Sequence, residues 1–395
     1  MNIEISRRLA ELREQVAGAD LDGWLIYDFR GGNPLATRLL GLPGNAHLTR
    51  RWFAWIPRDG QPTLLHSVIE AGTWSGLLGD AGIRRRAYTD HADLDTALGE
   101  ILRPGLRIAM EYSPMGSIPY GAHVDAGTVE RVRGFGVKIV TSADLLQRFL
   151  RWTDDDLVGH RTAASGVMAA KDAAFALIHR RLQAGELITE YEVQSEIGRV
   201  FDSLGLITDY PAIVGFGANA GNPHYAPTAD ACATLRPGQC VLIDLWAQVP
   251  DRPYADVTWM GCAGPPSDNL QALWLAVRGA RDAAVSLLRS GYADLQGWEV
   301  DRAARRIIDD AGYGAAFTHR LGHSIGKGPL HGDGANLDDF DTHDTRRLTP
   351  GLATSVEPGI YLPERGMGVR SEINVYFGPH GIEVTTPEQC DLIVL

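Results

Sequence analysis

Hydrophobic residues in the first part of the chain follow the period of a helix and then the period of strands. Ile5, Leu9, Leu12 and Val16 recur every three or four residues, which is the spacing of one apolar helix face. Short apolar runs follow and predict strands, with helical patterns such as DLDTALGEILR between them. The strand candidates are GWLIYDF, RWFAWIP, PTLLHSVI and RIAMEY. This alternation predicts an α/β domain over residues 1–152.

The pattern changes at Thr153, where long helices with clear start signals begin. Thr153 and Thr189 are each followed three residues later by an acid, which is the pattern of a capping box. Two further helices are expected over residues 267–289 and 300–311. Strand pairs lie around these helices, CVLIDLWAQ with YADVTWMG and LATSVEPGIYL with GMGVRSEINVYF. Residues 153–395 are therefore expected to form an α+β domain, with helices against an antiparallel sheet.

Each of the two predicted hairpins carries a pair of acids at opposed positions. If the first turn is centred near Pro250, Asp244 faces Asp256 across the strands. Across the second turn, Glu357 faces Glu372. Like charges opposed on a buried sheet are destabilising, and a buried carboxylate without a partner takes up a proton. Any single acid could instead face solvent or an arginine, but two such pairs together call for compensating cations.

Two divalent cations would neutralise the four negative charges of these carboxylates. His323 lies between the two hairpins and would add an imidazole nitrogen to the carboxylate oxygens. Such a ligand set suits Mn²⁺ and also accepts Co²⁺, Fe²⁺ or Zn²⁺. A pair of metal ions lowers the pKa of bound water towards 7 and polarises the carbonyl under attack. The residues alone therefore predict a dinuclear metal centre that supports hydrolysis.

The order and surroundings of these residues resemble the pita-bread metallopeptidases. The motifs that carry the resemblance are GHSIG at His323, EPGIY at Glu357 and GVRSEI at Glu372, with Asp244 and Asp256 ahead of them. A small α/β domain before the catalytic part is similar to the proline-specific branch, the prolidases and aminopeptidases P, and to creatinase.

The resemblance implies a fold and an activity. The fold would be an N-terminal α/β creatinase-like domain, residues 1–152, followed by a C-terminal α+β pita-bread catalytic domain, residues 153–395. The activity would be hydrolysis of the Xaa-Pro bond, in Xaa-Pro dipeptides for a prolidase or in longer peptides for an aminopeptidase P. The expected substrate is a small peptide with proline in the second position, and the expected assembly is a homodimer.

The resemblance also implies how the ligands divide between the two metal ions. Asp244 would bind one ion, and His323 and Glu357 would bind the other. Asp256 and Glu372 would bridge both.

Three residues beyond the ligands are implied to act on the substrate or the ligands. His224 would contact the substrate, His331 would steady the scissile carbonyl, and Arg370 would lie behind the ligands as a cation. Glu357 would also carry a proton from the attacking water to the leaving nitrogen. His331 is followed by glycine where the family usually has an acid, which is a departure from the pattern.

The same GHSIG stretch fits the G-x-S-x-G pattern of a serine-hydrolase nucleophile elbow at Ser324. An elbow serine needs a helix directly after it, yet glycines and a proline follow Ser324. Asp344 and His380 could complete a triad, so a serine hydrolase remains a rival interpretation. Two further rivals are a non-catalytic peptide-binding pita-bread module and metal-free creatinase-like chemistry. The presence of all five ligand types argues against both.

The composition argues against some classes of binding partner. The 395 residues include 37 basic and 49 acidic side chains and no dense basic run, so neither nucleic acid nor a membrane is an expected partner. The cysteines, Cys232, Cys240, Cys262 and Cys390, show no C-x-x-C spacing. We expect reduced, buried thiols in a cytoplasmic protein.

The choice between dipeptidase and aminopeptidase depends on a group that captures the carboxylate of the proline. The loop RGGNPLATRLLG carries Arg30 and Arg38, and Arg50 and Arg51 follow it. We hypothesise that such a loop of a second subunit closes the pocket. The sequence leaves open this choice, the physiological metal, the preferred first residue and the oligomeric state.

Overall fold

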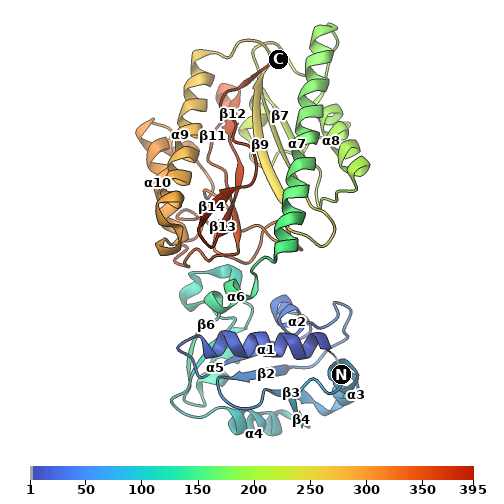
Figure 1. Cartoon of the computed structure of the whole chain (residues 1–395), viewed down its shortest axis with the longest axis vertical. Helices are drawn as coiled ribbons and strands as arrows, with labels where there is room; N and C mark the ends of the chain where they lie inside the picture. The colour runs from blue at the N-terminus through green and yellow to red at the C-terminus, as the bar shows by residue number, and fades with distance from the viewer. Residues whose placement is uncertain (1–2) are drawn as a thin grey trace. The chain divides into compact units, whose positions relative to one another are not determined.

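The computed structural model describes residues 3–395, which form two compact units. The first unit ends at Leu150 and the second begins at Arg151 (Figure 1). Each unit has its own sheets and its own hydrophobic core. The domain boundary expected from the sequence, between residues 152 and 153, stays a prediction.

The first unit is built on a six-stranded sheet of order β4-β3-β2-β1-β5-β6. Its strands are β1 (Gly23–Asp28), β2 (Trp52–Pro57), β3 (Thr63–Ser67), β4 (Arg84–Tyr88), β5 (Arg107–Met110) and β6 (Lys138–Thr141). Its helices are α1 (Ile3–Ala17), α2 (Pro34–Leu40), α3 (Ala71–Leu78), α4 (His91–Ile101), α5 (Ala126–Arg133) and α6 (Ala143–Phe149). The β1–β2 and β2–β3 pairs are antiparallel and the other three are parallel.

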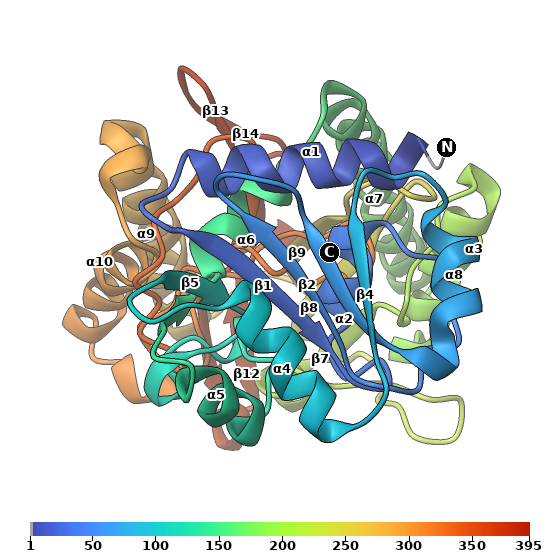
Figure 2. The ribbon, with the colours of Figure 1, turned by 90° about the horizontal axis from the view of Figure 1, so that it is seen from below.

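Helices cover both faces of this sheet. Apolar residues of α1, α2, α3 and α6 form one core with the strands, and those of α4 and α5 form a second core on the other face. Figure 1 shows α1 and α4 on opposite sides of the strands, and Figure 2 looks at the sheet from the side of α4. Successive strand residues point to opposite faces of the sheet, and because helices cover both faces, the strand side chains on each face are buried. The predicted α/β architecture is confirmed for this part of the chain.

The second unit combines three small sheets with two pairs of helices. Its strands are β7 (Ile213–Phe216), β8 (Cys240–Ala247), β9 (Ala255–Cys262), β10 (Ala353–Val356), β11 (Gly359–Leu362), β12 (Met367–Arg370), β13 (Ile373–Gly378), β14 (Gly381–Val384) and β15 (Ile393–Val394). Its helices are α7 (Asp154–Gln183), α8 (Glu190–Leu204), α9 (Asp268–Gly291) and α10 (Gly297–Asp310). The sheets have the orders β15-β9-β8-β7, β10-β13-β14 and β11-β12.

The two helix pairs flank the strands of the second unit (Figure 1). Helices α7 and α8 share a core with β7, β8 and β9. Helix α9 packs beside α10 and against β10, β11, β12 and β14. This is the predicted α+β arrangement. Within residues 3–395, no helix is both long and apolar enough to cross a bilayer.

The helix starts follow the capping signals of the sequence. Thr153 and Thr189 each accept a hydrogen bond from the backbone three residues on, and the acids at those positions bond back, so both predicted capping boxes are confirmed. Helix α10 begins three residues before the predicted start, because Glu299 accepts a hydrogen bond of 2.8 Å from the backbone of Gln296.

The register of the first hairpin differs from the prediction. Asp244 lies opposite Thr258, and Asp256 lies opposite Trp246, so the two acids are diagonal rather than directly opposed. The connecting loop, residues 248–254, is centred on Asp251 rather than on Pro250. Asp251 has a φ of 62°. A shift of two positions keeps both acids on one face of the sheet, since side chains alternate with a period of two.

The second hairpin has the predicted register, although its ladder is interrupted. The β10–β13 and β11–β12 ladders continue one register, which places Glu357 and Glu372 at mirror positions. Between the two ladders, the backbone amides form hydrogen bonds with segments outside the hairpin. The Glu357 amide donates to Leu321 O at 2.7 Å, and the Glu372 amide donates to Thr258 O at 3.3 Å. Pro358 has no amide to offer to the ladder. The interruption therefore falls where the acids lie.

The cysteines are all free. Cys240 and Cys262 are buried, as expected, and Cys232 is partly buried. The expectation of burial is wrong for Cys390, which is exposed because it lies in the connection between β14 and β15.

Two glycine-to-alanine changes should have opposite effects on stability. A Cβ at Gly368 in β12 would lie 1.9 Å from Ala220 O, a backbone atom that cannot move away cheaply. We expect Gly368→Ala to lower the free energy of unfolding by about 2–3 kcal/mol. Gly198, inside α8, has open space at that position, so Gly198→Ala should raise it by roughly 1 kcal/mol. Denaturant unfolding measures the free energy of unfolding of both variants. The same change in both would contradict the close approach of Gly368 to Ala220 and the open space at Gly198.

Candidate metal centre

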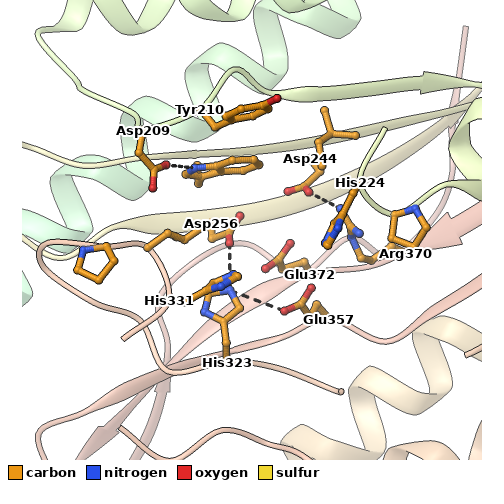
Figure 3. Close-up of a pocket in the computed structure, with 15 residues that line it drawn as sticks. Asp209, Tyr210, His224, Asp244, Asp256, His323, His331, Glu357, Arg370 and Glu372 are labelled. Atoms are coloured by element: carbon orange, nitrogen blue, oxygen red, sulfur yellow. Dashed lines mark hydrogen bonds and ion pairs between the residues drawn. The ribbon is translucent and has the colours of Figure 1, made fainter. Parts of the chain in front are cut away.

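All eight predicted site residues line one cavity of the second unit, with a volume of about 330 Å³. Figure 3 shows the carboxylates turned toward a common space with the histidine side chains beside them. The eight are His224, Asp244, Asp256, His323, His331, Glu357, Arg370 and Glu372.

The strands explain why the carboxylates meet. Asp244 and Asp256 project from the same face of the β8–β9 hairpin. Glu357 and Glu372 lie at the break in the second hairpin, and the backbone bond from Glu372 to Thr258 ties that break to β9. Residues more than a hundred positions apart are therefore held side by side by backbone hydrogen bonds.

His323 is held beside β10 by a close backbone approach. Its amide donates to Ser355 Oγ at 2.9 Å, and its carbonyl accepts from the Ser355 amide at 2.9 Å. A Cβ at Gly322 would lie 2.1 Å from Ser355 O, so the glycine of the GHSIG motif is required by this approach. The motif thus serves to bring an imidazole against the carboxylates.

The imidazole of His323 points a nitrogen at two carboxylates. Its Nε2 lies 3.4 Å from Asp256 Oδ2 and 3.7 Å from Glu357 Oε1. Its Nδ1 lies 3.0 Å from Ser324 O, and because a carbonyl only accepts, Nδ1 carries a proton. Fixing the proton on Nδ1 directs Nε2 toward the carboxylates, as is usual for a metal-binding histidine. Asp256, His323 and Glu372 offer ligand atoms within 4.8 Å of one another.

Three carboxylate oxygens in this cavity are buried and lack a hydrogen-bond partner within residues 3–395: Asp244 Oδ1, Asp256 Oδ1 and Glu372 Oε1. An unsatisfied buried carboxylate oxygen is costly. A divalent cation satisfies such oxygens and neutralises their charge, and oxygen donors with one imidazole are a ligand set that divalent transition metals accept. The residues present therefore fit a metal centre.

The electrostatics of the cavity also favour added cations. Burial raises the pKa of Asp244 to about 8, with Asp256 and Glu357 adding to the effect and Arg370 opposing it. Burial and the neighbouring carboxylates also raise the pKa of Glu372 well above its usual range. Burial acts to raise the pKa of Glu357 as well, but the charges of His323 and its other cationic neighbours outweigh it, and the pKa is lowered. Glu357 thus stays ionised most readily.

Thr258 contacts two of the predicted site residues but was not itself predicted from the sequence. Its hydroxyl donates to Glu372 Oε2 at 2.8 Å and accepts from Arg370 Nε at 2.8 Å. Arg370 in turn forms a buried ion pair with Asp244. Thr258 therefore links the cation behind the ligands to one of the ligands. The missed signal is its position two residues after Asp256, which puts it on the same strand face.

Two more supporting residues occupy the same spacing. Ser355, two residues before Glu357, donates its hydroxyl to Glu357 Oε1 at 3.0 Å. Asn374, two residues after Glu372, accepts from the Asp256 amide at 2.9 Å. Strand alternation would have identified both.

The two remaining predicted histidines, His224 and His331, line the same cavity. The His331 ring lies 4.2 Å from the His323 ring, and burial together with the charge of His323 lowers the pKa of His331 to about 3. His331 is therefore neutral near pH 7 and can donate one hydrogen bond. His224 lines the cavity from an exposed loop position.

The serine-hydrolase alternative receives no geometric support. Ser324 is 3% exposed and does not line the cavity. No helix follows it, and its segment pairs with Thr354 in an isolated bridge. Asp344 is engaged in a buried ion pair with Arg346, and His380 lies exposed in the turn between β13 and β14.

Comparisons with known proteins show the family to which the chain belongs. Residues 159–378, more than half of the chain, match the model of metallopeptidase family M24. An Xaa-Pro dipeptidase of Lactobacillus delbrueckii subsp. lactis is 32% identical over 222 residues, which are 56% of this chain and 55% of that protein. The match thus spans little more than half the length of that relative.

Solved structures extend the likeness in fold to nearly the whole chain. The dipeptidase PepE of Mycobacterium ulcerans has a TM-score of 0.71 and 24% identity, and the alignment covers 99% of this chain and 98% of that one. The N-terminal domain of a FACT complex subunit from Cicer arietinum has a TM-score of 0.67 at 12% identity, covering 98% and 97%.

Removing the hydroxyl of Thr258 should weaken metal binding. Thr258→Val leaves Arg370 Nε and Glu372 Oε2 without the hydroxyl that links them, and such a loss behind metal ligands costs about 10- to 100-fold in affinity. Titration calorimetry with Mn²⁺ measures the change, and Thr258→Ser should restore most of it. The matched control is Thr354→Val, because the buried Thr354 hydroxyl has no hydrogen-bond partner within residues 3–395. Equal affinities for both valine variants would contradict this role.

The stabilisation by metal should grow between about pH 6 and about pH 8. Because the folded, metal-free chain holds a proton on Asp244 up to about pH 8 while the unfolded chain releases it near its ordinary pKa, stability of the metal-free form falls as pH rises through this window. Metal ions must displace that proton, so they bind more tightly at the higher pH. Thermal unfolding with chelator and with Mn²⁺ should show the larger rise in Tm at about pH 8, and Asp244→Asn should flatten the difference. An increment that shrinks with pH would be the opposite result.

Proposed function

Because the chain belongs to metallopeptidase family M24, we propose that it is a metal-dependent dipeptidase that hydrolyses Xaa-Pro dipeptides. The observation that carries the proposal is the set of buried carboxylate oxygens around His323 that have no hydrogen-bond partner within residues 3–395 and that a divalent cation would satisfy. The similarity to an Xaa-Pro dipeptidase supports the choice of substrate.

The proposed centre holds two divalent ions, with Mn²⁺ as the first candidate and Co²⁺, Fe²⁺ or Zn²⁺ as substitutes. Asp244 would bind one ion, His323 and Glu357 the other, and Asp256 and Glu372 both. When bound, such ions activate water at neutral pH and polarise the peptide carbonyl. The carboxylate oxygens of Asp244, Asp256 and Glu372 that have no hydrogen-bond partner within residues 3–395 would be metal ligands.

The side chains of this chain would supply the proton transfers and the orientation. Glu357, whose pKa is lowered, is ionised and can take a proton and deliver it to the leaving nitrogen of the proline. His331, neutral near pH 7, and His224 border the cavity where the scissile carbonyl would lie. Arg370 would keep Asp244 in place through their ion pair.

An Xaa-Pro aminopeptidase that acts on longer peptides is the second candidate, since it would use the same centre. A dipeptidase needs a cation for the carboxylate of the proline, and Arg30, Arg38, Arg50 or Arg51 of a second subunit would take this role. Arg30 has a φ of 59°. A homodimer in the cytoplasm is part of the same proposal, drawn from the family resemblance and from the sparse cysteines.

The two candidates separate by the length of the preferred substrate. With Mn²⁺ present, the chain should cleave Leu-Pro faster than Leu-Pro-Gly, and chelator should abolish both activities. Asp256→Asn should lower kcat/KM by at least about 100-fold, since it removes a charged ligand. Ser324→Ala, a buried serine outside the cavity, is the control and should retain activity in the presence of Mn²⁺. Faster cleavage of the tripeptide would favour the aminopeptidase, and inhibition by an organophosphate but not by chelator would revive the serine hydrolase.

A further inference from the structure

One wall of the cavity has no part in the proposed metal centre. Asp209, Tyr210 and Trp246 line it together with the apolar Ile213 and Leu330. In Figure 3, Asp209 lies to the left of the carboxylates Asp244 and Glu372, and His224 lies to their right. Asp209 is the carboxylate among the residues that line the cavity outside the proposed metal ligands.

Asp209 is held in a fixed position although it is exposed. The indole Nε1 of Trp246 donates to Asp209 Oδ1 at 2.7 Å. The segment that carries Asp209 is anchored by two backbone hydrogen bonds of 2.9 Å between Ile207 and Gln248, just past the end of β8. The hydroxyl of Thr208 donates to Tyr210 O at 2.9 Å across the aspartate. Asp209 is thus pre-positioned from three directions.

The other oxygen, Asp209 Oδ2, is available for a ligand. Within residues 3–395, Asp209 forms no ion pair, and its hydrogen bond to Trp246 uses only Oδ1. Arg370, the cation among the lining residues, is already paired with Asp244. The wall therefore presents one uncompensated negative charge to whatever enters the cavity.

Asp209 lies one side chain away from the proposed metal ligands. Trp246 follows Asp244 by two residues on β8 and lies directly opposite Asp256, so its indole extends outward from the ligand positions. The α-amino nitrogen of a substrate lies only about 2.5 Å from the carbonyl carbon of the same residue. A group that reaches beyond the indole to Asp209 must therefore be a long side chain rather than the α-amino group.

A second hollow of about 420 Å³ adjoins the first and shares His224, His331, Glu357 and Arg370 with it. It is lined further by Arg320 and Asp341, so it holds one charge of each sign in addition to the shared residues. The scissile bond would lie at the shared residues, with one amino acid in each hollow. The second hollow, which a loop of a second subunit is proposed to close, suits the residue that ends in a carboxylate, and the hollow with Asp209 suits the residue before the scissile bond.

We propose that Asp209 selects substrates with a cationic side chain, lysine or arginine, in the residue before proline. The proposal rests on the proposed Xaa-Pro hydrolysis and specifies its substrate class. An ion pair with Asp209 would form equally in the ground state and in the transition state, so it acts as uniform binding and lowers KM more than it raises kcat.

The test compares Lys-Pro with norleucine-Pro, which has a side chain of similar length without the charge. The wild-type chain with Mn²⁺ should prefer Lys-Pro, and Asp209→Asn should reduce the ratio of the two kcat/KM values by roughly three- to tenfold, mainly through KM. Asp209→Lys should invert the preference and favour Glu-Pro over Lys-Pro. The matched control is Asp202→Asn, which removes an exposed acid at the end of α8 that lines neither hollow, and it should leave the ratio as in the wild type.

Two results with the Asp209→Asn variant would contradict the proposal that Asp209 selects a cationic side chain. An equal loss for Lys-Pro and norleucine-Pro in Asp209→Asn would assign Asp209 to the α-amino group or to folding instead. An unchanged ratio would remove it from substrate recognition. If the metal-loaded wild-type chain cleaves no Xaa-Pro peptide at all, the proposed function fails rather than this inference, and the binding of Lys-Pro relative to norleucine-Pro, measured by calorimetry, still tests Asp209.

Discussion

The crowding of four carboxylates in one buried space is the constraint on which the rest of the second unit depends. Asp244, Asp256, Glu357 and Glu372 come from two hairpins that backbone hydrogen bonds hold together, so they cannot move apart without loss of the sheets. Such a cluster is destabilising in itself, because burial and mutual repulsion both oppose ionisation. The fold thus stores an electrostatic cost at this point, and divalent cations offset it.

The residues around the carboxylates divide into those that hold the cluster together and those that face the substrate. Thr258, Ser355 and Asn374 bond to the ligands or their backbone from neighbouring positions on the same strands. Arg370 forms an ion pair with Asp244 and donates a hydrogen bond of 3.3 Å to the Tyr361 hydroxyl. The Tyr361 hydroxyl in turn lies 2.7 Å from Nε2 of His319. Burial lowers the pKa of His319 to about 4, so it is neutral near pH 7 and adds no charge. Support for the ligands is therefore mostly uncharged, and the charges are left to the ions.

Much of this could be predicted from the sequence, because local rules govern it. The family and the two-part fold were predicted correctly, and the mirror positions of Glu357 and Glu372 followed from a tight turn. The predicted register of Asp244 and Asp256 was wrong because the hairpin is centred on Asp251 rather than on Pro250, and strand alternation does not determine the centre of a turn. The place of Asp209 could not be predicted, since it depends on the pairing of Ile207 with Gln248, forty residues away in the chain.

Similarity of fold and similarity of chemistry depend on different residues in this protein. A likeness to the FACT subunit domain at 12% identity requires only that strand and helix patterns agree, and patterns of buried apolar residues tolerate wide substitution. The chemistry requires charged side chains that the sheets would be more stable without. This chain has all four carboxylates, the glycine that admits His323 and the hydroxyl that links Arg370 to Glu372, and it bears a cost in folding that binding of divalent cations offsets. The electrostatic cost of the buried carboxylates is therefore a stronger physical argument for a metal-dependent enzyme than the fold itself.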